Sequence, residues 1–93
     1  MSEIHFDVDM KFIEGSGAVK ARADVRFEML GGSLVLRSFS VIEQNGKPPW
    51  VGFPQKQGKT PGKYFPIVEA DGELRKAIIQ EILDIYEGSK TAP

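Results

Sequence analysis

Two segments near the N-terminus alternate strictly between apolar and polar residues, and this pattern constrains the fold more than any other feature of the chain. The apolar positions are even-numbered in residues 4–12 and odd-numbered in residues 19–29. A period of two places all of the apolar side chains on one face of a β-strand. Residues 14–17 (EGSG) supply the glycines that a tight reversal needs. The sequence therefore predicts a long antiparallel hairpin with one apolar face.

The remaining chain predicts shorter strands followed by one helix. Residues 34–43 include the apolar run LVL, which indicates a strand that is central in the sheet or buried in an interface. Short strands are expected at 50–53 and 64–68, where prolines favour a sheet edge, with a polar loop at 55–63 between them. Asp71 is a good N-cap for a helix with a wide apolar stripe, and Gly88 is expected to end that helix.

These elements predict an α+β fold, in which an antiparallel sheet of four to five strands, including the long N-terminal hairpin, is covered by one C-terminal helix. A chain of 93 residues is sized for one domain, which we place at residues 1–88, with a flexible tail at 89–93. No apolar run approaches the ~20 residues of a membrane span, and no signal peptide opens the chain. The absence of cysteine fits a cytoplasmic location.

Catalytic and metal-binding residues have little support in the sequence. His5 is the only histidine, and with Asp7 and Asp9 it extends too far along one strand to close on a single ion. Ser16 lies between glycines, but no residue is a plausible base for it. We therefore expect no enzyme activity, no catalytic residue, no metal, no cofactor and no small-molecule substrate.

Basic residues are concentrated in the middle of the chain. The net charge is −1, yet residues 14–66 contain eight Lys/Arg and four Asp/Glu. In this region three lysines are flanked by aromatic residues: Lys56, Lys59 and Lys63 lie between Trp50/Phe53 and Tyr64/Phe65. Lysines contact phosphates, and exposed rings stack on unpaired bases. Core aromatics beside an edge loop kept soluble by lysines are the alternative explanation.

Other cations are candidates of lower rank. Arg22 and Arg26 lie on the polar face of the second alternating segment, where ion pairs to Asp7 and Asp9 across the hairpin are the expected arrangement. Arg75 falls in the first turns of the predicted helix, next to acidic residues that would neutralise it.

The central stretch resembles the stage V sporulation protein G family of septation regulators. The resemblance is carried by LVLRSFSVIE and NG (34–43 and 45–46), WVGFPQK (50–56), TPG (60–62) and the aromatic pair at 64–65. It implies a small α+β homodimer that is bacterial, cytoplasmic and DNA-binding, and that regulates gene expression, sporulation and septation. Lys56 and Arg75 match family positions. Gln57 replaces the second residue of the family's basic pair, and Lys59 is the substitute for it.

The leading hypothesis is therefore a homodimeric, non-catalytic nucleic-acid-binding regulator. Its expected phosphate contacts are Lys56, Lys59, Lys63 and Arg75, with Arg22 and Arg26 in reserve. The alternative is a protein-interaction module that offers a sheet edge or the Trp50/Phe53 patch to a partner.

Overall fold

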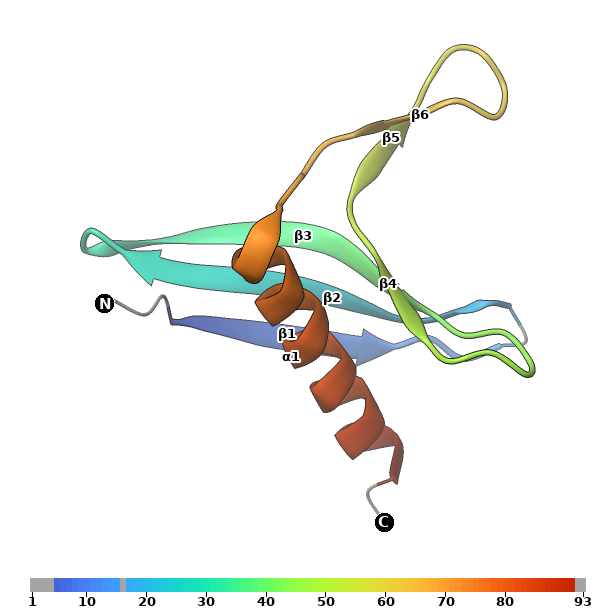
Figure 1. Ribbon diagram of the computed structural model, residues 1–93, viewed down its shortest axis with the longest axis horizontal. Helices are drawn as coiled ribbons and strands as arrows, with labels where there is room; N and C mark the ends of the chain where they lie inside the picture. The colour runs from blue at the N-terminus through green and yellow to red at the C-terminus, as the bar shows by residue number, and fades with distance from the viewer. Residues whose placement is uncertain (1–4, 16, 92–93) are drawn as a thin grey trace.

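The computed structural model describes residues 5–15 and 17–91, and the side chains of these residues up to Ser89. Its elements are β1 (Phe6–Phe12), β2 (Val19–Met29), β3 (Gly32–Ile42), β4 (Trp50–Gly52), β5 (Gln55–Gln57), β6 (Tyr64–Pro66) and α1 (Gly72–Thr91). Strands β1-β2-β3-β4 form one antiparallel sheet in that order, and β5 and β6 form a second, two-stranded sheet. Helix α1 crosses one face of the first sheet (Figure 1), so the predicted α+β fold is confirmed.

The predicted N-terminal hairpin is present, and a second hairpin follows it directly. Strands β1 and β2 pair in regular register from Phe6↔Phe27 to Phe12↔Ala21. Strands β2 and β3 are joined by a two-residue turn, in which Leu30 and Gly31 have φ angles of 52° and 74°. Positive φ at both central positions defines the type I′ turn that matches the twist of paired strands. The predicted strand residue Ile4 and turn residue Ser16 lie outside the described residues.

A β-bulge divides β3 into two halves. Ala23 pairs with Phe39 and Val25 pairs with Leu36, so β3 has one residue more than β2 in this interval. Ser38 adopts a φ of 76°, and its backbone N–H donates to Asp24 Oδ1 at 3.3 Å. Arg37 Nη1 donates to Asp24 Oδ2 at 3.0 Å. The Asp24 carboxylate therefore holds both bulge residues, and the extra residue reverses the side-chain alternation along β3.

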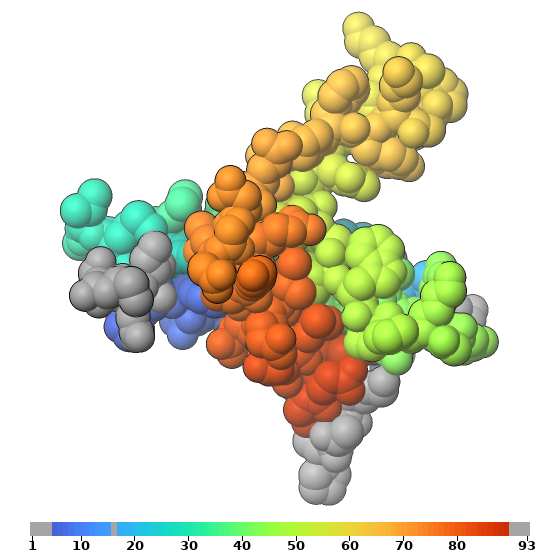
Figure 2. All heavy atoms as spheres, in the orientation of Figure 1, coloured from blue at the N-terminus to red at the C-terminus, as the bar shows by residue number. Residues whose placement is uncertain are grey.

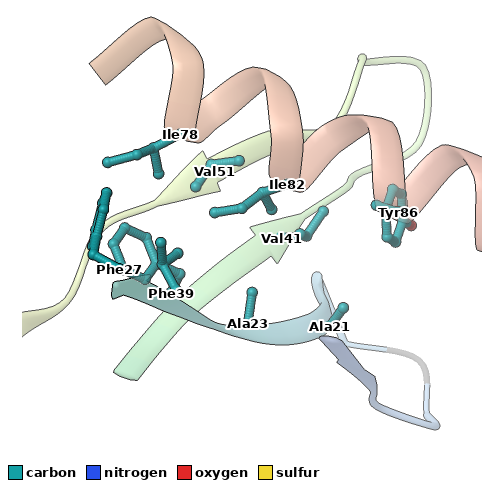
Figure 3. Close-up of a cluster of buried hydrophobic side chains, with 10 residues drawn as sticks. Ala21, Ala23, Phe27, Phe39, Val41, Val51, Ile78, Ile82 and Tyr86 are labelled. Atoms are coloured by element: carbon teal, nitrogen blue, oxygen red, sulfur yellow. The ribbon is translucent and has the colours of Figure 1, made fainter. Parts of the chain in front are cut away.

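The core lies between the sheet and α1. Strand β2 contributes the odd-numbered residues of its alternating pattern, and the helix contributes three positions spaced by four: the buried set is Ala21, Ala23, Val25, Phe27, Phe39, Val41, Val51, Ile78, Ile82 and Tyr86. Figure 3 shows the helix side chains directed at those of β2, β3 and β4. Burial of each large apolar side chain stabilises the fold by about 1.5–3 kcal/mol.

The helix begins as predicted but ends later. Arg75 N donates to the Asp71 carbonyl at 3.2 Å, which agrees with Asp71 as the residue that precedes the first turn. The prediction that Gly88 ends the helix is wrong, because α1 continues to Thr91. Gly88 does not have the positive φ of a terminating glycine, so the backbone stays helical through it. The predicted tail at 89–93 thus begins inside the helix, and residues 92–93 lie outside the described residues.

Residues 55–66 form an arm that stands away from the rest of the molecule (Figures 1 and 2). The prediction of a polar loop at 55–63 is wrong at its start, because Gln55–Gln57 form β5. The predicted short strand at 64–68 pairs with β5 and does not join the main sheet. We call the four-stranded sheet with α1 the body. In the described part of the chain no helix has the length and apolar character to cross a membrane.

Strand β3 is central, as predicted, but its apolar run is not buried. Leu34 is 51% exposed and Val35 is 37% exposed. Leu34 pairs with Phe27, and therefore faces the helix side of the sheet, beyond the end of the core. Val35 pairs with Arg26 on the opposite, outer face.

Candidate nucleic-acid interface

The arm is built from backbone pairing and has no buried core of its own. Three pairs join its strands: Gln55↔Pro66, Lys56↔Phe65 and Gln57↔Tyr64. Beyond them Gly58 N donates to the Lys63 carbonyl at 2.7 Å, and Lys63 N donates to the Thr60 carbonyl at 3.2 Å. At the base of the arm, Ile67 N donates to the carbonyl of the buried Pro54 at 3.0 Å. Hydrogen bonds at the tip and the base therefore hold the ribbon in place.

Gly58 is required by the position of one aromatic ring. A Cβ atom at this position would lie 2.7 Å from Phe65 Cε2 and 3.3 Å from the Lys63 carbonyl oxygen. No real Cβ tolerates the shorter distance, so only glycine lets the Phe65 ring lie across the strand. The ring nevertheless remains 59% exposed, and it forms the floor of a shallow site open to solvent.

All three arm lysines surround that ring. A hollow of about 540 Å³ is lined by Lys56, Gln57, Gly58, Lys59, Thr60, Lys63 and Phe65. We call this feature the lysine hollow. No Asp or Glu occurs between Glu43 and Glu69, so no carboxylate in the arm offsets the three positive charges. A basic site with an exposed aromatic floor suits a ligand that combines phosphates with flat rings.

The other face of the arm belongs to a different concave surface. Tyr64 and Pro66 alternate with Phe65 along β6, and they line a concave space of about 1120 Å³ between the arm and the outer face of β3 and β4. We call this space the groove. Trp50, on the edge strand β4, is 54% exposed and lines the groove with Tyr64 and Val35. The arm therefore has a basic face and an apolar face.

The predicted arginines do not join the lysine hollow. Arg22 and Arg75 line the groove, and Arg75 lies 4.7 Å from the centre of the Phe53 ring, a cation–π contact at the start of α1. Arg26 is exposed on the outer face of the sheet, opposite Val35 on one side and Asp7 on the other. Lys56 and Arg75, the two residues that match the resembled family, thus lie on different surfaces.

The expected ion pairs across the first hairpin do not form. Asp9 lies opposite Asp24, and Lys11 lies opposite Arg22, so like charges face each other at two positions. Among the described residues of the outer face the ion pair present is Arg37–Asp24, at 3.0 Å. This pair fixes the bulge instead of joining the hairpin strands.

The predicted Trp50/Phe53 patch separates into two environments. Phe53 is half-buried and makes an edge-to-face contact with the core residue Phe39, at 4.9 Å between ring centres. Trp50 pairs with Ile42 at the sheet edge, and its ring lies beside Gly52, where a Cβ would be 3.7 Å from Trp50 Cζ3. Trp50 alone of the two is a surface residue, while Phe53 connects the base of the arm to the core.

An ionisable group of the core, the phenol of Tyr86, has a shifted pKa. Burial, and next a hydrogen bond to Glu43, raise the pKa of Tyr86 to about 12. The phenol donates to Glu43 Oε1 at 2.6 Å, and Phe12 stacks on its ring with 5.6 Å between centres. This contact ties the last turns of α1 to the end of β3 and is structural. Within the described residues, no group of three His, Cys, Asp or Glu is placed to hold a metal ion.

Sequence reasoning identified the lysines but missed the groove. The groove depends on how the arm leaves the body, and no short-range pattern records that angle. One signal was available, because the exposed Val35 belongs to the apolar run that predicted burial in an interface. A scan against protein-family models finds no match to the chain, and searches of curated proteins and of solved structures also find none.

Proposed function

We propose that this protein is a non-catalytic, nucleic-acid-binding regulator that contacts the phosphate backbone through its arm. One observation carries the proposal: Lys56, Lys59 and Lys63 surround the exposed Phe65 ring in a single hollow on an arm without acidic residues. The body is unsuited to this role, because the acids and bases on its outer face offset each other. A role in controlling gene expression, sporulation or septation is what the family resemblance adds.

The arm has the dimensions and chemistry for such contact. A two-stranded β-ribbon fits the major groove of duplex DNA, and lysines on one face of a ribbon reach successive phosphates. Phe65 offers a stacking surface that accepts any unpaired base. Three phosphate contacts release about three counterions on binding to duplex DNA, so the logarithm of affinity falls with the logarithm of salt with a slope of roughly −3.

A homodimer is part of the proposal. Exposed apolar side chains outside the groove, around the β2–β3 turn, leave surface that one α1 helix does not cover: Met29, Leu30 and Leu34. Two copies present two arms, and the second arm then binds at a high effective concentration. Light scattering on the purified chain is expected to give twice the mass of 10.3 kDa, and the mass of one chain would contradict the dimer.

The test of nucleic-acid binding is fluorescence anisotropy with labelled duplex DNA, single-stranded DNA and RNA at two salt concentrations. The variant Lys56→Ala/Lys59→Ala/Lys63→Ala is expected to lose at least about tenfold in affinity and most of the salt dependence. The matched control is Lys11→Ala/Lys47→Ala/Lys76→Ala, which removes the same charge from exposed positions outside the arm. It should retain most of the affinity.

Two results would overturn the proposal. Absence of binding to all three nucleic acids at low salt would exclude the function itself. Equal losses in the arm variant and in the control would show that net charge, and not the lysine hollow, determines binding. Comparison of Phe65→Leu with wild type on single-stranded and duplex DNA then measures the stacking contribution, which we expect only for unpaired bases.

A further inference from the structure

Strand β3 has a free edge. Strand β4 pairs only with Ser40, Val41 and Ile42, and no described residue pairs with the preceding part of β3 on that side. Met29 and Gly32 flank the two-residue turn, and residues in this position exchange both of their backbone hydrogen bonds. Hydrogen-bonded pairs alternate with non-bonded pairs along an antiparallel ladder. The pairs Glu28↔Ser33 and Arg26↔Val35 are therefore non-bonded, and Ser33 and Val35 direct their N–H and C=O groups away from β2. These backbone groups are available to another strand.

The groove runs beside this free edge, and aliphatic and aromatic side chains line its walls. Val35 lies on the β3 side, Pro66 and Ile67 lie on the arm side, and Trp50 lies at the end next to β4. Ile67 is 64% exposed and Trp50 is 54% exposed. The exposed rings of Trp50 and Tyr64 alone would also suit nucleobases. The outward N–H and C=O groups of the adjoining β3 edge, however, are matched by another peptide backbone, so the groove and the edge together favour an extended polypeptide.

The charges of the groove are all positive. The charged residues that line it are Arg22, Arg37 and Arg75, with no Asp or Glu among them. Arg37 is paired with Asp24, whereas Arg22 and Arg75 form no ion pair in the described part of the chain. Two acids, Glu69 and Asp71, line an adjoining hollow together with Arg75. Negative charge on an occupant of the groove would therefore be matched by Arg22, which has no acid beside it in the groove.

We infer that the groove binds an extended, acidic segment of a partner protein, which adds as a strand to the free edge of β3. Its backbone would pair with Ser33 and Val35, its apolar side chains would enter the groove, and its acidic side chains would meet Arg22 and Arg75. A sugar–phosphate backbone cannot complete the hydrogen bonds of a strand edge. A second copy docked through the same groove would bring arginines against arginines, which charge repulsion disfavours.

The groove and the lysine hollow share no lining residue, although residues of the arm contribute to both. The inference therefore goes beyond nucleic-acid binding and does not depend on it. Loss of one activity without the other is the expected result of variants confined to either surface.

The experiment uses fluorescein-labelled octapeptides of alternating valine and glutamate, valine and lysine, or valine and threonine, titrated with the full chain. The glutamate peptide is expected to bind at least about tenfold more tightly than the lysine peptide. In ¹⁵N spectra the amide signals of Ser33 and Val35 should move on binding, while those of Lys59 and Lys63 should not.

Val35→Pro is the most direct variant, because proline removes one outward N–H and leaves the hydrogen bonds to β2 in place. We expect roughly a tenfold loss of peptide affinity. Val35→Thr keeps the N–H and the shape, and is its matched control. If Val35→Pro fails to fold, Arg22→Glu provides the second test, and it should invert the preference from the glutamate peptide to the lysine peptide.

Three outcomes would overturn the inference. One is no binding of the glutamate peptide up to about 1 mM, a weak limit for a strand-edge site. Another is undiminished binding to both Val35→Pro and Arg22→Glu. The third is displacement of the peptide by a single-stranded oligonucleotide whose own binding requires Arg22, which would assign the groove to nucleic acid. The triple lysine variant of the arm should bind the peptide as wild type does.

Discussion

The body and the arm of this protein are held together in different ways. In the body, ten apolar side chains are at most 7% exposed, and they join three strands to the helix. In the arm, Tyr64 and Phe65 are 53% and 59% exposed, and the strands are held by short backbone ladders. The body owes its shape to burial, whereas the arm owes its shape to hydrogen bonds, one glycine and its attachment at Pro54.

This difference assigns distinct tasks to the two regions. A two-stranded ribbon without a core is marginally stable in water when isolated, so the arm depends on the body for its position. Because its side chains do not stabilise the fold, they are free to serve binding. We therefore expect substitutions in the arm to change affinity with little effect on stability, and substitutions in the core to do the reverse.

The strongest test of this contrast compares two phenylalanines. Phe39→Ala removes a fully buried ring and should lower the free energy of unfolding by about 3–5 kcal/mol, because the truncation leaves a cavity. Phe65→Ala in the arm should lower it by less than about 1 kcal/mol. Urea unfolding followed by circular dichroism measures both. If Phe39→Ala does not fold, Phe39→Leu provides a smaller truncation at the same position. Similar losses in the free energy of unfolding at positions 39 and 65 would contradict the contrast between body and arm.

The buried phenol of Tyr86 should make stability depend on alkaline pH. Its pKa of about 12 in the folded protein exceeds the ordinary value of 10.0, so above pH 10 the unfolded chain releases the proton more readily than the folded one. Stability therefore falls as pH rises from 10 to 12. Tyr86→Phe removes the hydrogen bond to Glu43, so its free energy of unfolding at neutral pH should be lower by about 1 kcal/mol. Because this variant has no phenol to ionise, it should also lack this contribution to the alkaline decline.

Unfolding curves at pH 8, 10 and 11 distinguish the two proteins. The arm counterpart, Tyr64→Phe, is expected to change stability at neutral pH by less than about 0.5 kcal/mol. An alkaline decline that is as steep in Tyr86→Phe as in wild type would show that other groups cause it.

The carboxylate of Asp24 should have a smaller effect, confined to the bulge. Asp24→Ala removes the acceptor for Ser38 N–H and for Arg37, and both donors then face solvent, so we expect a loss of about 1 kcal/mol. The control is Asp9→Ala, on the same face and directly opposite Asp24. Because it removes a like charge, it should be neutral or slightly stabilising. Thermal unfolding of both variants, measured together, provides the comparison.

Gly58→Ala should have the smallest effect on stability and a clear effect on the arm. A methyl group at this position meets the Phe65 ring, so the ring must move, whereas the free energy of unfolding should change by less than about 0.5 kcal/mol. Aromatic proton shifts of Phe65 report the movement. Gly17→Ala is the control, because its Cβ would enter open space. A shift of the whole spectrum in Gly58→Ala would show that arm and body are more tightly coupled than we describe.

Much of the body could be predicted from the sequence, because its elements are long and periodic. The alternation in β2 identified Ala21, Ala23, Val25 and Phe27 as one face, and all four are core residues. The stripe of the C-terminal segment identified the helix, but not its end. Gly88 is a strong stop signal only where the backbone turns left-handed, and local sequence does not show whether it does.

The arm could not be predicted in the same way. Strands β5 and β6 have three residues each, too few for a periodic pattern. The predicted strand at 64–68 contains β6, whereas the polar residues of β5 have the composition of a loop. The three lysines and the aromatics were identified as a group, yet their convergence around Phe65 depends on the register Lys56↔Phe65. Arg22 and Arg26 were grouped with them by charge, and Arg75 by the family resemblance as well, whereas the structure places all three outside the lysine hollow.

The bulge in β3 has a consequence for how this chain can vary. On the two sides of Arg37 and Ser38 the strand follows two alternating series that are offset by one position, with Leu34 and Leu36 in one series and Phe39 and Val41 in the other. Deletion of either bulge residue would leave a regular strand in which Leu34, Leu36, Phe39 and Val41 alternate on one face, so β3 would lose the contacts to Asp24 but keep its register with β2. Gain or loss of a residue elsewhere in the strand would instead move one of the two series to the outer face. Relatives of this chain should therefore tolerate the loss of one residue at 37–38 better than a change of length elsewhere in β3.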